Sequence, residues 1–300
     1  MTDGPLHYRV FMHSYPGFNS TSILFYGEKD AVLIDATQLL SDAHRLAAEL
    51  IEMGKRLTHI YVSHFHPDHH FGAGVLKAAF PRARVVALPS VVRDIIFTTD
   101  DKVDMWGDVF GANEPETVLF PMPLSEPRLE VEEHVLELSD DWEGDSANNS
   151  VVWVPSLNLV CATDVAYLDC HIWMIESNPA RRQKWRESIR ELRDFDAEVI
   201  IPGHISADKL ALRDTSCVDW SLEYLDVYEE VLASANTGAE LWEGMEKAYP
   251  GMKGMDFGVQ WNARLLFPNS CPDWFPQLPG QPGGIFLDPQ GEFIGDAPRE

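Results

Sequence analysis

One short segment of the chain concentrates side chains that bind metals. His64, His66, Asp68 and His69 directly follow an apolar run, residues 58–63, that we predict to be a β-strand. Imidazole and carboxylate groups are the usual protein ligands of zinc and related divalent ions. A histidine-rich surface loop is the alternative interpretation, and it suits a single histidine better than this cluster. We therefore predict a metal site in this segment.

The spacing within the segment favours two metal ions over one. His64 and His66 are two residues apart, so both imidazoles can leave the same face of an extended backbone. Pro67 then turns the chain, which lets Asp68 and His69 point toward a neighbouring position. Two adjacent ions fit this geometry.

The pattern His-x-His-x-Asp-His over residues 64–69 resembles the signature of the metallo-β-lactamase-fold hydrolases. In that family, further ligands come from three later strand ends. Residues 159–164 form an apolar strand ending in Asp164, which resembles the family's Gly-Asp turn, and residues 198–204 end in a Pro-Gly-His turn that supplies His204. The resemblance implies an α+β fold, a four-layer αββα sandwich with metals at one edge. Composition alone indicates only α/β or α+β.

The third strand end departs from the family pattern. Asp145 stands where the resemblance requires the histidine of a Gly-His-Thr turn. A carboxylate is a legitimate zinc ligand and a better ligand for harder ions such as manganese or iron(II). The alternative is that Asp145 is a plain turn acid that leaves one metal under-coordinated, with Asp140 and Asp141 as nearby competitors.

Carried over residue by residue, the resemblance implies two divalent metal ions, zinc first, with manganese or iron admitted by Asp145. The implied sets are His64, His66 and Asp145 for one metal, Asp68, His69 and His204 for the second, and Asp164 as the bridge. Two-metal sites hold ions about 3.5–4 Å apart and lower the pKa of a shared water toward roughly 7. The resulting hydroxide would attack a carbonyl at neutral pH.

Several residues are candidates for roles beyond simple ligation. Asp68 is expected to orient the water and move its proton. Tyr167 and His171 are candidates for the proton donor or oxyanion partner, with packing as the alternative for both. Asp35 ends a predicted strand and resembles an acid that holds a ligand from behind. His70 is predicted to be a turn residue rather than a ligand.

The expected function is a hydrolase in which metal-bound hydroxide attacks the carbonyl of a small molecule, most simply by opening a lactone, lactam or cyclic carbamate. A thioesterase or an open-chain esterase fits the same site. Two alternatives come from other classes. One is an iron-dependent oxidoreductase, because a carboxylate-rich site admits iron. The other is a non-catalytic metal-binding protein, because a lost histidine could disable the site.

Composition limits the partners. The net charge is −25 and the pI is about 4.6, so a phosphate backbone would be repelled and we expect no nucleic-acid partner. The chain has no apolar stretch of membrane-spanning length and no secretory signal layout, so we expect no membrane partner. The four cysteines show no Cys-x-x-Cys pairing, which favours reduced thiols and a cytoplasmic location.

We predict a catalytic domain over residues 1–215 and a C-terminal extension over residues 216–300. The extension starts with helices near 219–235 and 241–249 and continues as a tail rich in proline and aromatic residues. The tail either packs on the domain or forms a homo-oligomer interface. Residues 94–126 are predicted to be irregular and to close over a substrate.

Overall fold

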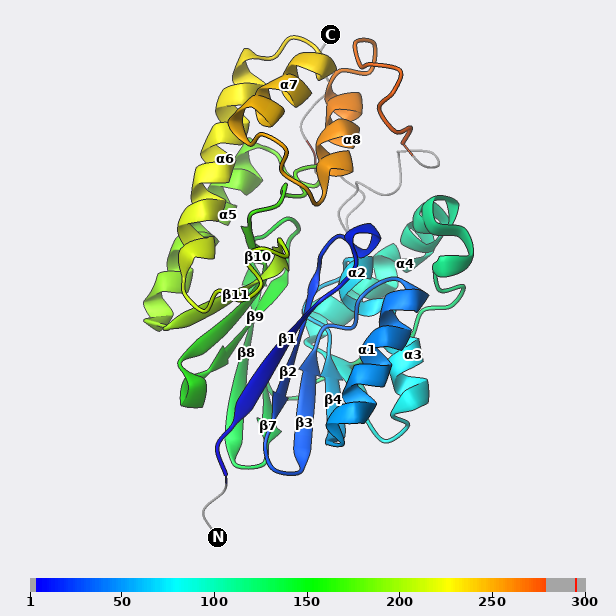
Figure 1. The fold of residues 1–300 in the computed structure, drawn as a ribbon, viewed down its shortest axis with the longest axis vertical. Helices are drawn as coiled ribbons and strands as arrows, with labels where there is room; N and C mark the ends of the chain where they lie inside the picture. Colours follow the sequence, from blue (N-terminus) through cyan, green and yellow to red (C-terminus); the bar gives the residue numbers. More distant parts are fainter. Residues whose placement is uncertain (1–3, 279–294, 296–300) are drawn as a thin grey trace.

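Two β-sheets pack face to face, with helices covering both outer faces (Figure 1). The structure is a computed structural model, and it describes residues 4–278 and residue 295. The strand order is β1-β2-β3-β4-β5-β6 in the first sheet and β11-β10-β9-β8-β7 in the second. This is the four-layer αββα sandwich that the sequence predicts.

The first sheet is mixed. Strands β1 to β3 are antiparallel, whereas β3 to β6 are parallel and are therefore connected through helices. The strands are β1 (His7–Met12), β2 (Thr21–Tyr26), β3 (Asp30–Ile34), β4 (Arg56–Tyr61), β5 (Arg84–Ala87) and β6 (Met122–Pro123). The helices are α1 (Leu40–Met53), α2 (Pro67–His70), α3 (Ala73–Ala79) and α4 (Pro89–Phe110), with 3-10 turns η1 (Tyr15–Gly17) and η2 (Gly111–Asn113).

The second sheet is antiparallel except at one edge. Strands β10 and β11 run parallel, and α5 makes the crossover between them. The elements are β7 (Arg128–Val131), β8 (His134–Trp142), β9 (Asn149–Val154), η3 (Pro155–Leu157), β10 (Leu159–Leu168), α5 (Pro179–Glu191), η4 (Leu192–Phe195) and β11 (Val199–Ile205).

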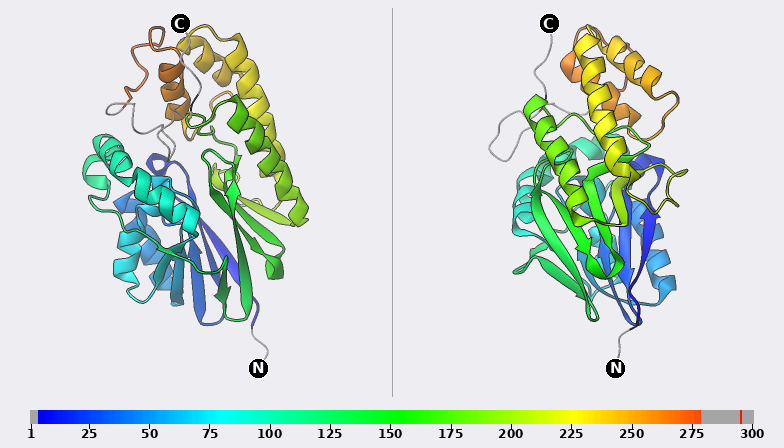
Figure 2. Two further views of the ribbon diagram at one scale, coloured as in Figure 1. Left: turned by 180° about the vertical axis from the view of Figure 1, so that it is seen from behind. Right: turned by 90° about the vertical axis from the view of Figure 1, so that its left-hand side faces the viewer.

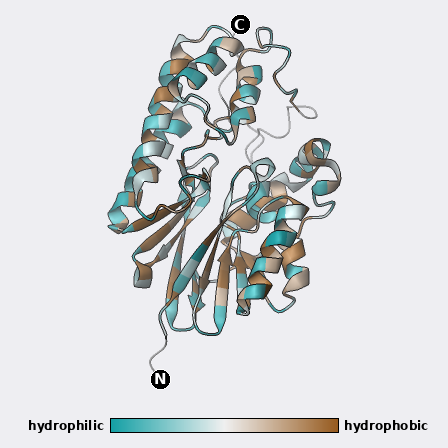
Figure 3. Ribbon diagram, in the orientation of Figure 1, coloured by the Kyte–Doolittle hydropathy of each residue, from teal (hydrophilic) through white to brown (hydrophobic). Residues whose placement is uncertain are grey.

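The sandwich is held together by apolar side chains from both sheets. Val32 and Ile60 of the first sheet belong to the same buried cluster as Leu136, Val152 and Leu159 of the second. Figure 3 shows the brown, hydrophobic residues along these inner strands, while the outer helices alternate hydrophobic and hydrophilic residues. Burying one face of each element against the next layer is what such a pattern requires.

Three helices follow the second sheet; the first lies along the outer side of that sheet, and the other two lie past its upper end (Figure 2). They are α6 (Ser216–Ser234), α7 (Gly238–Ala248) and α8 (Asp256–Leu266). Tyr224 of α6, Leu241 of α7 and Val259 of α8 share one buried cluster with Val165 of β10. The helix α8 falls in the part that the sequence presents only as a Gly-, Pro- and aromatic-rich tail. Beyond residue 278 the predicted tail lies outside the described residues, except for residue 295, and its role in an oligomer stays a prediction.

The prediction of an irregular segment over 94–126 was wrong for its first half. Residues 94–110 belong to α4, a helix of 22 residues that starts with Pro89 at its first position. Proline favours that position because its missing N–H has no intrahelical partner there. Val91 and Ile95, in the first half of α4, are buried in the cluster that contains the first sheet, whereas Met105 in its second half is buried in the cluster shared with the C-terminal helices.

The structure also bears on the predicted compartment. Cys161, Cys170 and Cys217 are buried, Cys271 is partly buried, and each is a free thiol. Among the described residues, no helix combines the length and apolar character needed to cross a membrane. The cytoplasmic location remains a prediction.

Candidate metal centre

The structure brings all seven predicted ligands to one edge of the sandwich. They come from the turn after β4, from α2, from the loop between β8 and β9, and from β10 and β11. They are His64, His66, Asp68, His69, Asp145, Asp164 and His204, and each is at least nine-tenths buried.

The seven ligands form two adjacent groups whose ligand atoms lie within 4.8 Å of one another in each group. The groups are His64, His66, Asp145 and Asp164, and Asp68, His69 and His204. Oδ1 of Asp164 is 3.2 Å from Nε2 of His69, and its Oδ2 is 3.6 Å from Nε2 of His64 and 3.1 Å from Nε2 of His204. One carboxylate therefore reaches both groups, as expected of a bridging ligand.

The donor atoms fit a pair of divalent ions. Nε2 of His64, Nε2 of His69, Oδ1 of Asp145 and Oδ1 of Asp164 are buried without a hydrogen-bond partner among the described residues. Unpaired polar atoms are costly in a protein interior, so four in one cluster need an explanation. Nitrogen and carboxylate oxygen donors converging from several elements are what a dinuclear centre requires.

Asp35 fixes the orientation of two ligands. Its Oδ2 accepts a hydrogen bond from Nδ1 of His69 (2.8 Å) and another from the hydroxyl of Ser63 (2.8 Å). Because the Ser63 hydroxyl donates to Asp35, its oxygen accepts from Nδ1 of His64 (3.0 Å). Both imidazoles therefore carry the proton on Nδ1 and present the lone pair of Nε2 to the site.

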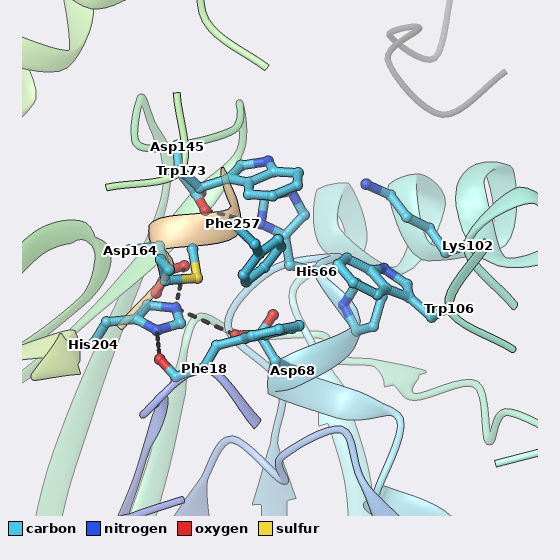
Figure 4. A pocket seen from close by; sticks show the side chains of 12 residues that line it. Phe18, His66, Asp68, Lys102, Trp106, Asp145, Asp164, Trp173, His204 and Phe257 are labelled. Atoms are coloured by element: carbon cyan, nitrogen blue, oxygen red, sulfur yellow. Dashed lines mark hydrogen bonds and ion pairs between the residues drawn. The ribbon is translucent and has the colours of Figure 1, made fainter. Parts of the chain in front are cut away.

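His204 and His66 are held in the same way by other acceptors. Nδ1 of His204 donates to the carbonyl of Phe18 (2.8 Å), which leaves Nε2 facing Asp68 and Asp164 (Figure 4). Nε2 of His66 lies 3.0 Å from Glu176, while its Nδ1 lies 2.9 Å from Oδ2 of Asp145. The sequence did not predict Glu176, because nothing around it distinguishes it from other acids.

Unusual backbone geometry places Asp164 and Asp145. Thr163 has a φ of 48°, which is rare for a β-branched residue, and the pairing of β10 with β11 shifts register around it. Gly144 allows a close approach, because a Cβ there would lie 2.7 Å from the carbonyl oxygen of Asp164. Local strain and a glycine thus direct both carboxylates into one site.

Burial and neighbouring charges set the protonation of the ligands. Burial lowers the pKa of His64 well below its usual value. Burial acts against the charged form of His204 as well, but Asp164 beside it prevails and raises the pKa to about 10. Burial raises the pKa of Asp145 to about 6, although His66 opposes this effect. A metal ion must displace the proton of His204 before this imidazole can bind it, so metal binding should weaken as pH falls.

The other candidate residues differ in whether they contact the two ligand groups. The hydroxyl of Tyr167 lies 2.9 Å from Asp145 and 3.0 Å from Asp164, so Tyr167 adjoins the ligands as well as packing in the core. His171 does not reach them, because Nδ1 of its ring bonds the hydroxyl of Tyr224 among the C-terminal helices. His70 is buried in α2, where its Nδ1 bonds the carbonyl of His66. The competing acids Asp140 and Asp141 are exposed and do not join the ligand groups.

A pocket lies beside the candidate ligands (Figure 4). Its metal-binding wall includes His66, Asp68, Asp145, Asp164 and His204. The other wall is aromatic and apolar except for Lys102, and it consists of Phe18, Pro67, Lys102, Trp106, Trp173, Met255 and Phe257. The sequence did not predict Lys102 and Trp106 as wall residues, because they lie in α4, a segment that was predicted to be irregular.

Comparisons with known proteins agree with the geometry. The family model described as the Metallo-beta-lactamase superfamily matches residues 15–204. Among solved structures, a metallo-beta-lactamase family protein from Thermus thermophilus is similar with a TM-score of 0.61 and 18% identity, over 86% of this chain and 91% of its own. A metallo-beta-lactamase from Pontibacter korlensis is similar with a TM-score of 0.52 and 17% identity, over 74% of this chain and 95% of its own.

At these identities the solved structures show a shared fold and nothing finer. A comparison with curated proteins found no match. The family model, in contrast, spans more than half of the chain and includes every predicted ligand. This protein therefore belongs to the metallo-beta-lactamase superfamily.

Proposed function

We propose that the protein is a metal-dependent hydrolase that opens a small lactone, lactam or cyclic carbamate. The observation that carries the proposal is the set of buried ligand atoms without hydrogen-bond partners, in two groups that contribute five residues to the lining of a largely aromatic pocket. Two divalent ions held by the seven ligands would supply Lewis acidity and an activated water at neutral pH. An apolar pocket with a few convergent polar groups is the usual form of a small-molecule site.

Asp68 is suited to handle the proton of the attacking water. It lines the pocket, and its carboxylate lies 3.4 Å from Nε2 of His69 and 3.3 Å from Nε2 of His204. Burial opposes its ionised form, but His69 and His204 hold the pKa well below its usual value. Asp68 therefore stays ionised and can accept a hydrogen bond from water.

Tyr167 is suited to donate to the developing oxyanion. Burial and the adjacent carboxylates raise the pKa of its phenol well above the usual value, so it keeps its proton. Its ring stacks on His204 with centroids 4.8 Å apart, which fixes its orientation. The hydroxyl bonds Asp145 (2.9 Å) and Asp164 (3.0 Å), which line the pocket, and this places it beside the reacting groups. His171 lies too far into the C-terminal helices to share this role.

The aromatic wall indicates the shape of the substrate. Phe18, Trp106 and Phe257 contact one another with ring centroids 5.1–6.3 Å apart, and Trp173 packs against Trp106 and Phe257. Flat or apolar groups pack well against such a surface. A small ring with an attached apolar group would complement this wall.

A hydrolysis screen with metal analysis of the same sample tests the proposal. Lactones, lactams, cyclic carbamates, thioesters and open-chain esters are assayed on protein purified without added zinc and on protein loaded with zinc, manganese or iron(II). Metal-dependent opening of a cyclic substrate supports the proposal. Turnover of thioesters or open-chain esters alone would replace the substrate class. Oxygen uptake by the iron form, or metal binding without any turnover, would overturn it.

A further inference from the structure

One histidine ligand, His66, lies between two buried carboxylates on opposite sides of its ring. Nδ1 is 2.9 Å from Oδ2 of Asp145, and Nε2 is 3.0 Å from Oε2 of Glu176. His66 is 5% exposed, and the two acids are 1% exposed each. The second carboxylate is not in either ligand group, so its contact with His66 needs its own explanation.

The second acid is itself held by a buried cation from a different element. Nζ of Lys102, in α4, donates to Oε1 of Glu176 at 2.6 Å, and Lys102 is 3% exposed. The same ammonium lies 5.4 Å from the ring centre of Phe65, the residue between the first two histidine ligands. Lys102 and Glu176 are 74 residues apart in the sequence, and their ion pair ties the pocket wall to His66.

A neutral imidazole donates from one ring nitrogen and offers a lone pair on the other. Only the Nδ1 side of His66 faces the converging ligands, so Nε2 must carry the proton if the ring is to bind metal. Glu176 accepts from that position, and Lys102 balances the charge of Glu176. We propose that Glu176 is the positioning residue that fixes the metal-binding form of His66, and that Lys102 allows a carboxylate to stay buried there.

The proposal rests on the proposed metal site and assigns the two partners different roles. Glu176→Gln places an amide between His66 and Lys102. Lys102 attracts the amide oxygen, which turns the NH₂ group toward Nε2 of His66. The ring must then accept at Nε2, so its proton moves to Nδ1 and blocks the metal. Lys102→Met has no such effect on the ring, because the carboxylate of Glu176 remains and the site becomes more negative.

The test measures zinc dissociation constants by chelator competition and the visible spectrum of the cobalt(II) form. For Glu176→Gln we expect the zinc dissociation constant to rise about 10–100-fold, with an altered cobalt spectrum. For Lys102→Met we expect a lower melting temperature of the metal-free protein, because a buried carboxylate loses its cation, without weaker zinc binding. A purely structural ion pair would give both variants the same loss of stability and the same zinc affinity.

Controls separate this inference from general damage and from failure of the proposed function. Glu229→Gln is the control, because it removes an acid that accepts from Arg182 (2.8 Å) and Arg186 (2.6 Å) and belongs to neither ligand group. It should leave the zinc affinity unchanged. If Glu176→Gln does not fold, the double variant Lys102→Met/Glu176→Leu, which leaves no acceptor at Nε2 of His66 and no unpaired buried charge, is compared with Lys102→Met alone, and weaker zinc binding is again expected. Equal zinc affinity in that comparison, or in Glu176→Gln and the parent, would overturn the positioning role. A parent protein that binds no metal would instead overturn the proposed function.

Discussion

Gly203 and Asp164 touch so closely that no side chain fits between them. A Cβ on Gly203 would lie 1.8 Å from Oδ1 of Asp164 and 2.7 Å from the carbonyl carbon of Thr163. Asp164 can hold its bridging position only if residue 203 is a glycine. The Pro-Gly-His turn therefore provides His204 and also leaves the space that Asp164 needs.

Gly203→Ala should therefore abolish binding of at least one metal ion. The new methyl group must push Asp164 out of the position from which it reaches both ligand groups, at a cost of about 1–3 kcal/mol in the free energy of unfolding. Metal content by mass spectrometry and thermal unfolding with and without zinc measure both effects.

Gly74→Ala is the matched control, because nothing lies within 4 Å of a Cβ at this position in α3. It should keep the full metal content and gain about 0.5–1 kcal/mol in stability, since alanine suits a helix interior better than glycine. A Gly203→Ala protein with normal metal content would show that Asp164 does not bridge.

The clustering of the seven candidate ligands could be predicted from the sequence because they occupy short motifs near strand ends. The segment 64–69 carries four of them, and Asp164 and His204 each end or nearly end an apolar run. Asp145 could be placed only by its position in the order of turns. The structure adds that it lies beside His66 and that Asp140 and Asp141 do not.

The pocket wall could not be predicted, because its residues meet only in the folded chain. The polar run near Asp100 and the prolines after residue 110 obscured the helix α4, and with it Lys102 and Trp106. Met255 and Phe257 reach the pocket from the start of α8, in a stretch of sequence whose glycine, proline and aromatic content obscured the helix. Long-range ion pairs such as Lys102 with Glu176 leave no local pattern at all.

Substitutions at Asp145 test whether the carboxylate is a ligand. Asp145→Ala should lower the metal content below that of the parent, because it removes an oxygen donor from one group. Asp145→His should keep zinc but lose relative affinity for manganese, since nitrogen is a softer donor than carboxylate oxygen. Competition titrations with zinc and manganese measure the preference.

Asp140→Ala is the control for these titrations, because it removes an exposed acid five residues earlier in the chain. It should leave metal content unchanged. The ligand role of Asp145 is wrong if Asp145→Ala and Asp145→His both match the parent in metal content and preference.

Loss of the Tyr167 hydroxyl should slow turnover without removing metal. If this hydroxyl stabilises the oxyanion, Tyr167→Phe lowers kcat about 10²–10³-fold on the substrate that the screen identifies. Tyr61→Phe removes another buried hydroxyl, one that bonds Ser150 at 2.7 Å, and should leave kcat unchanged. Steady-state kinetics with metal analysis of each variant distinguish the two. A Tyr167→Phe enzyme with the parent's kcat would limit Tyr167 to packing.

Glu114, a buried acid outside the two ligand groups, should make the free energy of unfolding depend on pH. Glu114 is 3% exposed, and both of its oxygens accept from the Gln38 amide at 2.9 and 3.0 Å. Burial raises its pKa from 4.5 to about 8, and the charge of Asp68 adds to this effect, although the bonds from Gln38 oppose it. In the unfolded chain the same acid ionises near 4.5.

Between these two pKa values the folded protein holds a proton that the unfolded chain has lost. The contribution of Glu114 to the free energy of unfolding is therefore largest below about pH 4.5. As the pH rises from there to about 8, this contribution falls by about 1.4 kcal/mol per pH unit. Glu114→Gln cannot ionise, so the variant should gain stability relative to the parent by that amount per unit. Urea unfolding of the metal-free proteins from pH 6 to 8 measures the slope. Glu116→Gln is the control, because it removes an exposed acid two residues away, and its stability should change with pH as that of the parent does. If the stability of Glu114→Gln also runs parallel to that of the parent, Glu114 is ionised in the folded protein throughout this pH range.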